Sequence, residues 1–117
     1  MRTIAQILVA IVALLHAYFL VLEMFLWATP FGAKTFKRPL AEMQAQKVLA
    51  ANQGLYNGFL AAGLLWGLVS DQTDVQVFFL VCVIVAGAYG AATVNKRILV
   101  VQAAPALLAL VAVLAAA

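Results

Sequence analysis

Two ionisable side chains lie seven residues apart in an otherwise apolar stretch near the start of the chain, His16 and Glu23. An imidazole titrates near neutral pH without help from its surroundings. A carboxylate in a low-dielectric site needs a cation or hydrogen-bond donors to stabilise its charge. If the two groups face one cavity, they can move protons or act as general acid and base on a bound substrate. His16 and Glu23 are therefore the candidate catalytic residues.

A second polar cluster interrupts a later apolar stretch, in the run Asn52-Gln53-Gly54-Leu55-Tyr56-Asn57-Gly58. On a helix of about 100° per residue, its four polar residues fall within one arc of about 140°. The two glycines fall on the opposite side, and their spacing is the small-xxx-small pattern that lets membrane helices approach closely. The pattern predicts one face for polar contacts and another for close packing.

Depth relates the two clusters, because a helix rises about 1.5 Å per residue. Asn52 and Gln53 would lie at about the depth of Glu23, and Asn57 close to the depth of His16. We expect a polar pocket that opens on one side of a membrane, and interhelical hydrogen bonding is the alternative use of the same residues. The candidate ligand-binding residues are His16, Glu23, Asn52, Gln53, Tyr56, Asn57, Tyr89 and Gln102.

The composition indicates which elements must position these residues. Hydrophobic residues make up 68% of the 117 residues and charged residues 9%, against about 25% charged in soluble domains. We therefore predict an integral membrane protein. A spanning helix needs about 20 apolar residues, and short connections make successive helices antiparallel neighbours. The predicted fold is all-α, an up-down four-helix membrane bundle in one domain (1–117), with spans Ile4–Trp27, Val48–Val69, Val75–Val94 and Ile98–Ala115.

The cations are unevenly divided between the predicted connections. Four lie in residues 28–47 and two in residues 95–97, whereas the other side has one arginine and two aspartates. By the positive-inside rule, the connections 28–47 and 95–97 face the cytoplasm and both termini face outward. The residues that carry this bias are Lys34, Lys37, Arg38, Lys47, Lys96 and Arg97 on one side, and Arg2, Asp71 and Asp74 on the other.

Several classes of function are disfavoured by the motifs. No basic patch is interleaved with aromatic residues, so we expect no nucleic-acid partner. There is no phosphate-binding loop, dinucleotide fingerprint or HExxH motif, and we expect no cofactor. One histidine and one glutamate are too few ligands for a metal site, and Cys82 has no second cysteine to pair with. The expected partners are the lipid bilayer and a small-molecule ligand, and a homo-oligomer stays open.

Two segments carry a resemblance to a known family. Glu23–Trp27 and Leu49–Gly63, with His16 upstream, resemble a small bacterial integral-membrane family catalogued as domain-of-unknown-function family 1304. The resemblance covers nearly the whole chain and implies a four-helix protein of the bacterial inner membrane. It implies little about activity. Small multidrug transporters also have four spans and a glutamate in the first helix, but the long basic connection 28–47 departs from them, so their glutamate's role is not transferred to Glu23.

Three functions are therefore consistent with the sequence. The first is the binding or passage of a small polar or amphipathic ligand through the polar pocket. The second is a membrane-embedded acid–base enzyme, isomerase-like or epimerase-like, that uses His16 and Glu23. The third is a structural or assembly subunit, in which the polar residues only hold helices together.

Overall fold

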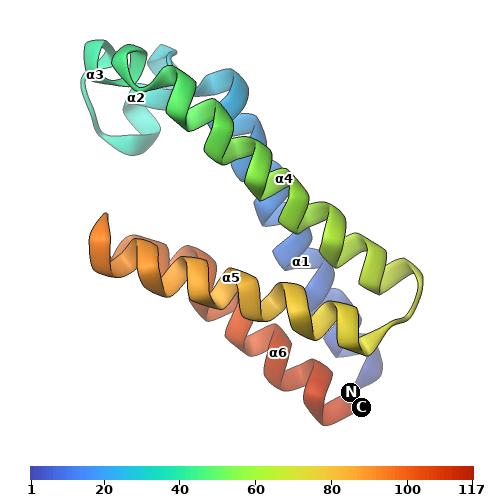
Figure 1. Cartoon of the computed structure of the whole chain (residues 1–117). Helices are drawn as coiled ribbons and strands as arrows, with labels where there is room; N and C mark the ends of the chain where they lie inside the picture. The colour runs from blue at the N-terminus through green and yellow to red at the C-terminus, as the bar shows by residue number, and fades with distance from the viewer. The chain divides into compact units, whose positions relative to one another are not determined.

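The apolar stretches of the sequence form four long helical rods in the computed structural model, which describes all residues from Met1 to Ala117. Together with two short helices they make six α-helices, and the chain has no β-strand, which confirms the all-α prediction (Figure 1). The rods are α1 (Arg2–Val21) continued by the π-helical segment η1 (Leu22–Leu26), α4 (Lys47–Val69), α5 (Thr73–Thr93), and the π-helical segment η2 (Leu99–Ala103) continued by α6 (Ala104–Ala116).

Three of the rods are long and apolar enough to cross a membrane: Arg2–Leu26, Thr73–Thr93 and Leu99–Ala116. Helix α4 has 23 residues and only one charged residue, so length and charge do not set it apart. Asn52, Gln53 and Asn57 lower its apolarity instead. These three helices identify the chain as a membrane protein. A crossing by α4 stays a prediction.

The connection between η1 and α4 is not the plain loop that the sequence suggested, because it contains two short helices. They are α2 (Pro30–Phe36) and α3 (Leu40–Ala45). Thr29 caps α2 by accepting a hydrogen bond from the Gly32 N–H at 3.2 Å, and its hydroxyl donates to the Leu26 carbonyl at 2.6 Å. Pro30 occupies the first turn, where a missing N–H costs nothing.

The structure comprises two compact units, which we describe separately. One consists of Met1–Leu14 and Leu60–Ala117, and we call it the core unit; the other consists of Leu15–Phe59, and we call it the loop unit. The prediction of a single domain stays a prediction.

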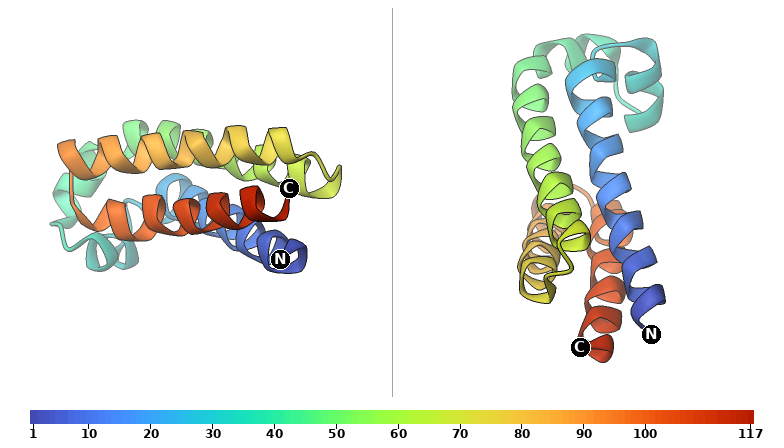
Figure 2. Two further views of the ribbon diagram at one scale, coloured as in Figure 1. Left: turned by 90° about the horizontal axis from the view of Figure 1, so that it is seen from below. Right: turned by 90° about the vertical axis from the view of Figure 1, so that its right-hand side faces the viewer.

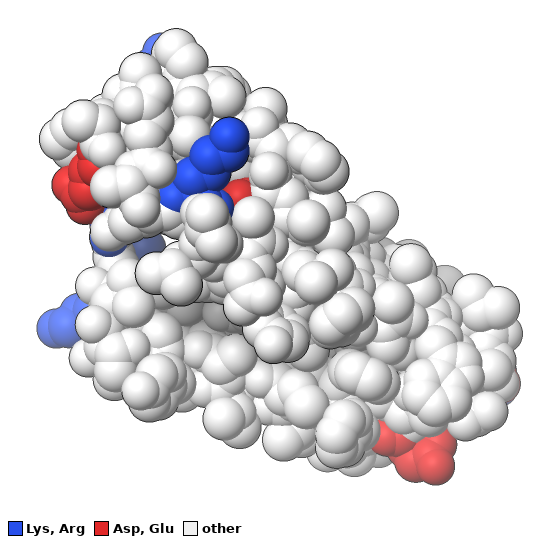
Figure 3. All heavy atoms as spheres, turned by 45° about the horizontal axis from the view of Figure 1, so that its top comes forward, with Lys and Arg blue, Asp and Glu red and all other residues white.

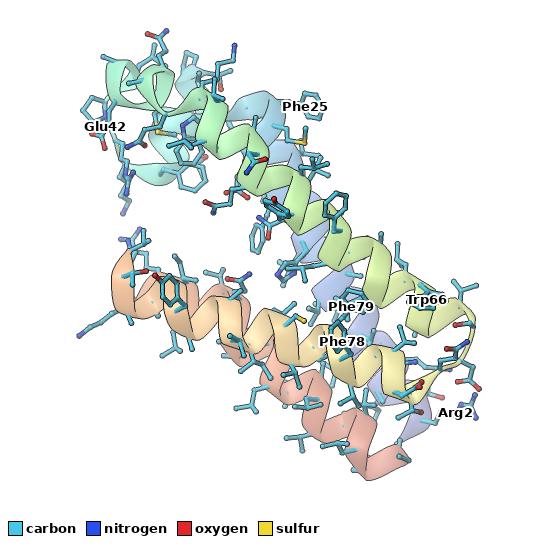
Figure 4. All side chains as sticks on the ribbon, viewed as in Figure 1. Arg2, Phe25, Glu42, Trp66, Phe78 and Phe79 are labelled. Atoms are coloured by element: carbon cyan, nitrogen blue, oxygen red, sulfur yellow. The ribbon has the colours of Figure 1, made fainter.

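Residues from all four rods form the buried core of the core unit. Helices α5 and α6 lie side by side and run in opposite directions (Figures 1 and 2). Phe79 of α5 packs directly against Gly63 of α4, where any side chain on Gly63 would overlap the ring (Figure 4). The core residues are Ala5, Val9, Val12, Ala13, Leu64, Leu80, Val83, Ala106, Ala109, Ala112 and Val113.

One end of the core unit gathers both chain termini and the turn between α4 and α5. Arg2 forms an ion pair with Asp71 of that turn. A cavity of about 110 Å³ at the same end is lined by both Arg2 and Ala117. The two ends of the chain therefore lie close together, as Figure 2 also shows.

Charged side chains occupy little of the surface. Most of the face in Figure 3 carries no Lys, Arg, Asp or Glu atom. Many large apolar side chains are exposed, among them Trp66 and Phe78. A soluble protein rarely exposes extended apolar surface, and a lipid-facing surface accounts for this one.

Candidate functional site

The loop unit places the end of α1, with η1, against the first half of α4. Gly54 makes the approach possible, since a methyl group there would lie 3.0 Å from the Glu23 Cβ and 2.8 Å from the Met24 Cγ. At Gly58 it would lie 2.5 Å from a methyl carbon of Leu20. The small-residue face of α4 thus packs within the chain, against the helix that carries Glu23.

Glu23 and Asn57 meet at this contact. The Asn57 side-chain amide donates a hydrogen bond to a carboxylate oxygen of Glu23. Both side chains are buried, with Glu23 7% and Asn57 9% exposed. The two ion pairs that Lys or Arg forms in this chain are Arg2–Asp71 and Arg38–Glu42, so neither neutralises Glu23. An amide donor is the hydrogen-bond partner that the structure gives to this carboxylate.

The other three polar residues of the α4 run do not share this contact. Asn52, Gln53 and Tyr56 are exposed. Asn57 differs because it lies at the edge of the polar arc nearest the glycine face, about 60° from Gly54 on the helical wheel. A glycine face that packs on η1 therefore carries Asn57 inward with it and leaves the remainder of the arc outside.

His16 is also buried in the loop unit, one turn and a half before η1. Its side chain is 0% exposed, and its ring meets Phe19 edge-on with 5.1 Å between the centroids. The predicted place of His16 in one site with Glu23 stays a prediction.

Tyr89 and Gln102 belong to the core unit. Tyr89 is largely exposed on α5, and Gln102 is half-buried within η2. The proposed membership of these two residues in one site with Glu23 stays a prediction.

The sequence did not predict the two π-helical segments, and each of them contains a predicted site residue. Glu23 lies in η1 and Gln102 in η2. A π-helical turn inserts an extra residue into a helix and is frequent at functional sites. Pro105 lies just beyond η2 and has no backbone N–H to donate to a carbonyl of the preceding turn. Its absence favours the wider π geometry there. No comparable signal in the sequence marks η1.

Sequence reasoning also missed Gln76, which is buried and donates to the Gly67 carbonyl at 2.9 Å. Its contact ties the end of α4 to the start of α5. We assign it a structural role.

Comparison with known proteins assigns the chain to a family. The sequence model of the family "Protein of unknown function (DUF1304)" matches residues 10–114, which includes Glu23, Asn57 and both π-helical segments. The chain belongs to this family. It is also 32% identical over 115 residues to "Uncharacterized protein YpaA" of Lactococcus lactis subsp. lactis (strain IL1403), covering 95% of this chain and 97% of that protein. No solved structure matches the chain.

The assignment to DUF1304 confirms the resemblance, and the family description names no function. What the site offers is a buried carboxylate held by one amide donor, a buried imidazole on the same helix, and an exposed polar stripe on α4 beside them. Such a set can hold a cation or a hydrogen-bonding group, and it can lock two helices together.

Proposed function

We propose that this chain is a four-span protein of the bacterial inner membrane that binds or passes a small amphipathic ligand through Glu23. The observation that carries the proposal is the Glu23–Asn57 hydrogen bond, buried within a membrane-spanning helix and without a Lys or Arg partner. Ionisable side chains inside a membrane are costly and typically mark a pathway or a ligand site.

We infer the number of crossings from parity. Arg2 and Ala117 line the same cavity, which supports a placement of both termini on one side of the membrane. Three crossings would put them on opposite sides, whereas four return the chain to the starting side. Helix α4 is long enough to be the fourth, and the Arg2–Asp71 ion pair supports this by holding the end of α4 beside the start of α1.

The orientation rests on charge. The connection 28–47 has an excess of lysine and arginine, which favours the cytoplasm. Glu23 lies three residues before the end of its rod at Leu26, so the proposed site belongs to the cytoplasmic half of the membrane. Asn52, Gln53 and Tyr56 supply hydrogen-bonding groups beside it on α4.

The chemistry of the site favours a ligand with a protonated amine. A buried carboxylate is stabilised when a cation pairs with it. Neither of the chain's two arginine ion pairs includes Glu23. A membrane-soluble amine would supply that charge while its apolar part stays in lipid.

Carbodiimide labelling tests this proposal. Dicyclohexylcarbodiimide partitions into membranes and modifies carboxyl groups there, and mass spectrometry locates the adduct. We expect labelling of Glu23 in reconstituted protein, slowed several-fold by octylamine and not by octanol, its neutral counterpart. The exposed Glu42 of α3 is the internal control for carboxyl reactivity, and Glu23→Gln removes the site itself.

Equal protection by octylamine and octanol, or protection of Glu42 to the same degree as Glu23, would overturn the amine site.

A second function has an observation of its own in its favour. The direct Asn57–Glu23 hydrogen bond, together with the close approach at Gly54 and Gly58, is what a purely structural helix contact requires. Under that function, Glu23→Gln keeps an acceptor for Asn57 and leaves the stability unchanged.

A further inference from the structure

A second candidate site lies at the end of the first rod, apart from Glu23 and Asn57. It is a pocket of about 80 Å³ in the loop unit, between the end of η1 and the start of α4. Such a volume holds several water molecules or one small anionic group. The residues that line it are Met24, Phe25, Trp27, Ala28, Thr29 and Lys47.

Two polar groups of this pocket, on Lys47 and Trp27, are donors with no acceptor in the chain. Lys47 is exposed and takes part in neither of the chain's ion pairs, in contrast to Arg38, which pairs with Glu42 at 3.6 Å. The indole N–H of Trp27 is buried and has no hydrogen-bond partner. A buried donor without an acceptor costs about 1–3 kcal/mol. The Thr29 hydroxyl already donates to the Leu26 carbonyl and accepts from the Gly32 N–H.

The surroundings of the pocket are those of a membrane boundary. Trp27 follows the apolar rod Arg2–Leu26, and Lys47 begins α4. Large apolar side chains flank the pocket on both helices: Phe25 is 67% exposed, and Val48 and Leu49 are 82% and 75% exposed. Phe25 projects away from the ribbon in Figure 4. Tryptophan and lysine are typical of the headgroup level of a bilayer, and apolar side chains next to them meet acyl chains.

We infer that this pocket binds the phosphate of an anionic phospholipid, with Lys47 as the charge partner and the Trp27 indole N–H as a hydrogen-bond donor. A phosphate diester has the acceptor oxygens that both groups lack. The lipid's acyl chains lie along Phe25, Val48 and Leu49. The site is independent of the amine site at Glu23, because no residue lining the pocket takes part in the Glu23–Asn57 contact through a hydrogen bond.

The chain's two tryptophans allow a direct measurement. In Trp66→Phe, Trp27 is the only tryptophan, and its fluorescence reports on lipid at the pocket. In Trp27→Phe, Trp66, which belongs to the core unit and is 57% exposed, reports on lipid elsewhere. Each variant is reconstituted with brominated phosphatidylglycerol or brominated phosphatidylcholine, whose bromines quench nearby tryptophan. The ratio of the two quenching constants gives the preference for the anionic lipid.

We expect Trp27 to prefer phosphatidylglycerol and Trp66 to show no preference. In the Trp66→Phe background, Lys47→Gln should lower the preference about fivefold, the factor for about 1 kcal/mol per lysine near an anionic surface. Lys34→Gln is the matched control, since it removes the same charge from α2 outside the pocket. It should leave the preference nearly unchanged.

Equal effects of Lys47→Gln and Lys34→Gln would overturn the site, because they would show general attraction to the basic connection. An equal preference for phosphatidylglycerol at Trp27 and Trp66 would also overturn the site. A further arm separates the two sources of phosphate: inorganic phosphate added to vesicles of phosphatidylcholine should not change Trp27 fluorescence. A saturable change that Lys47→Gln abolishes would overturn the lipid as the ligand in favour of free phosphate.

Discussion

At the scale of single residues, Asn57 separates from the polar residues that surround it in the sequence. Asn52, Gln53 and Asn57 are chemically alike, and no property of the residue types predicts which one is buried. The packing of Gly54 on Glu23 decides it, because that contact turns one edge of the polar arc inward. The existence of a polar cluster on α4 was predictable from the sequence, whereas its division into a buried and an exposed part depended on the partner helix.

Asn57→Leu tests the energetic weight of the buried hydrogen bond. Leucine has a similar volume but leaves the Glu23 oxygen without its donor, so we expect a loss of about 1 kcal/mol, near the upper range for polar contacts between membrane helices. Reversible unfolding in bicelles measures it. Asn52→Leu is the control and should not destabilise, since Asn52 is exposed.

The double variant Glu23→Gln/Asn57→Leu completes the cycle. A coupling between the two positions is expected because they form one contact. Asn57→Leu at full stability, or a loss in Asn52→Leu of equal size, would contradict a structural role for the Glu23–Asn57 bond and leave only its role toward a ligand.

At the scale of elements, the long rods were predictable and the connection 28–47 was not. Apolar length and polar breaks placed the four rods within a few residues of their observed ends. The two short helices of the connection depend on features with little periodicity, such as the Thr29 cap and Pro30 in the first turn. The π-helical turns depend on local hydrogen bonding that no residue pattern at η1 reveals.

Two glycine-to-alanine substitutions compare rigid with adaptable contacts in the loop unit. A Cβ at Gly32 would overlap the backbone carbonyl oxygens of Leu26 and Trp27, and backbone cannot move aside easily. A Cβ at Gly58 would meet a terminal methyl of Leu20, which can change rotamer. We expect Gly32→Ala to destabilise by about 3 kcal/mol and Gly58→Ala by less than about 1 kcal/mol.

Thermal unfolding of both variants in one detergent measures the difference, and limited proteolysis between residues 28 and 47 reports on the connection itself. Gly32→Ala should increase cleavage there, because its backbone contact holds the start of α2 against the end of η1. An equal loss in both variants would argue against this packing of α2.

At the scale of the whole molecule, composition was sufficient for the class of protein but not for the number of membrane crossings. The same polar residues that make α4 a candidate site also make it the least apolar rod, so hydropathy recognises three spans. The ion pair between Arg2 and Asp71 is a contact across 69 positions of sequence, and no local pattern predicts it. That contact, with both termini at one cavity, supports the proposed even number of crossings, which stays a proposal.

Labelling of single cysteines tests the number of membrane crossings and the orientation of the chain together. In a Cys82→Ser background, Lys37→Cys and Asp71→Cys are treated in intact cells with a membrane-impermeant maleimide. If α4 crosses the membrane and the basic connection is cytoplasmic, only position 71 is labelled, and position 37 reacts after the cells are opened. Labelling of position 37 alone would keep four crossings and invert the orientation. Labelling of both positions, or of neither, would mean that α4 does not cross, and would place Glu23 and Asn57 outside any two-helix contact within the bilayer.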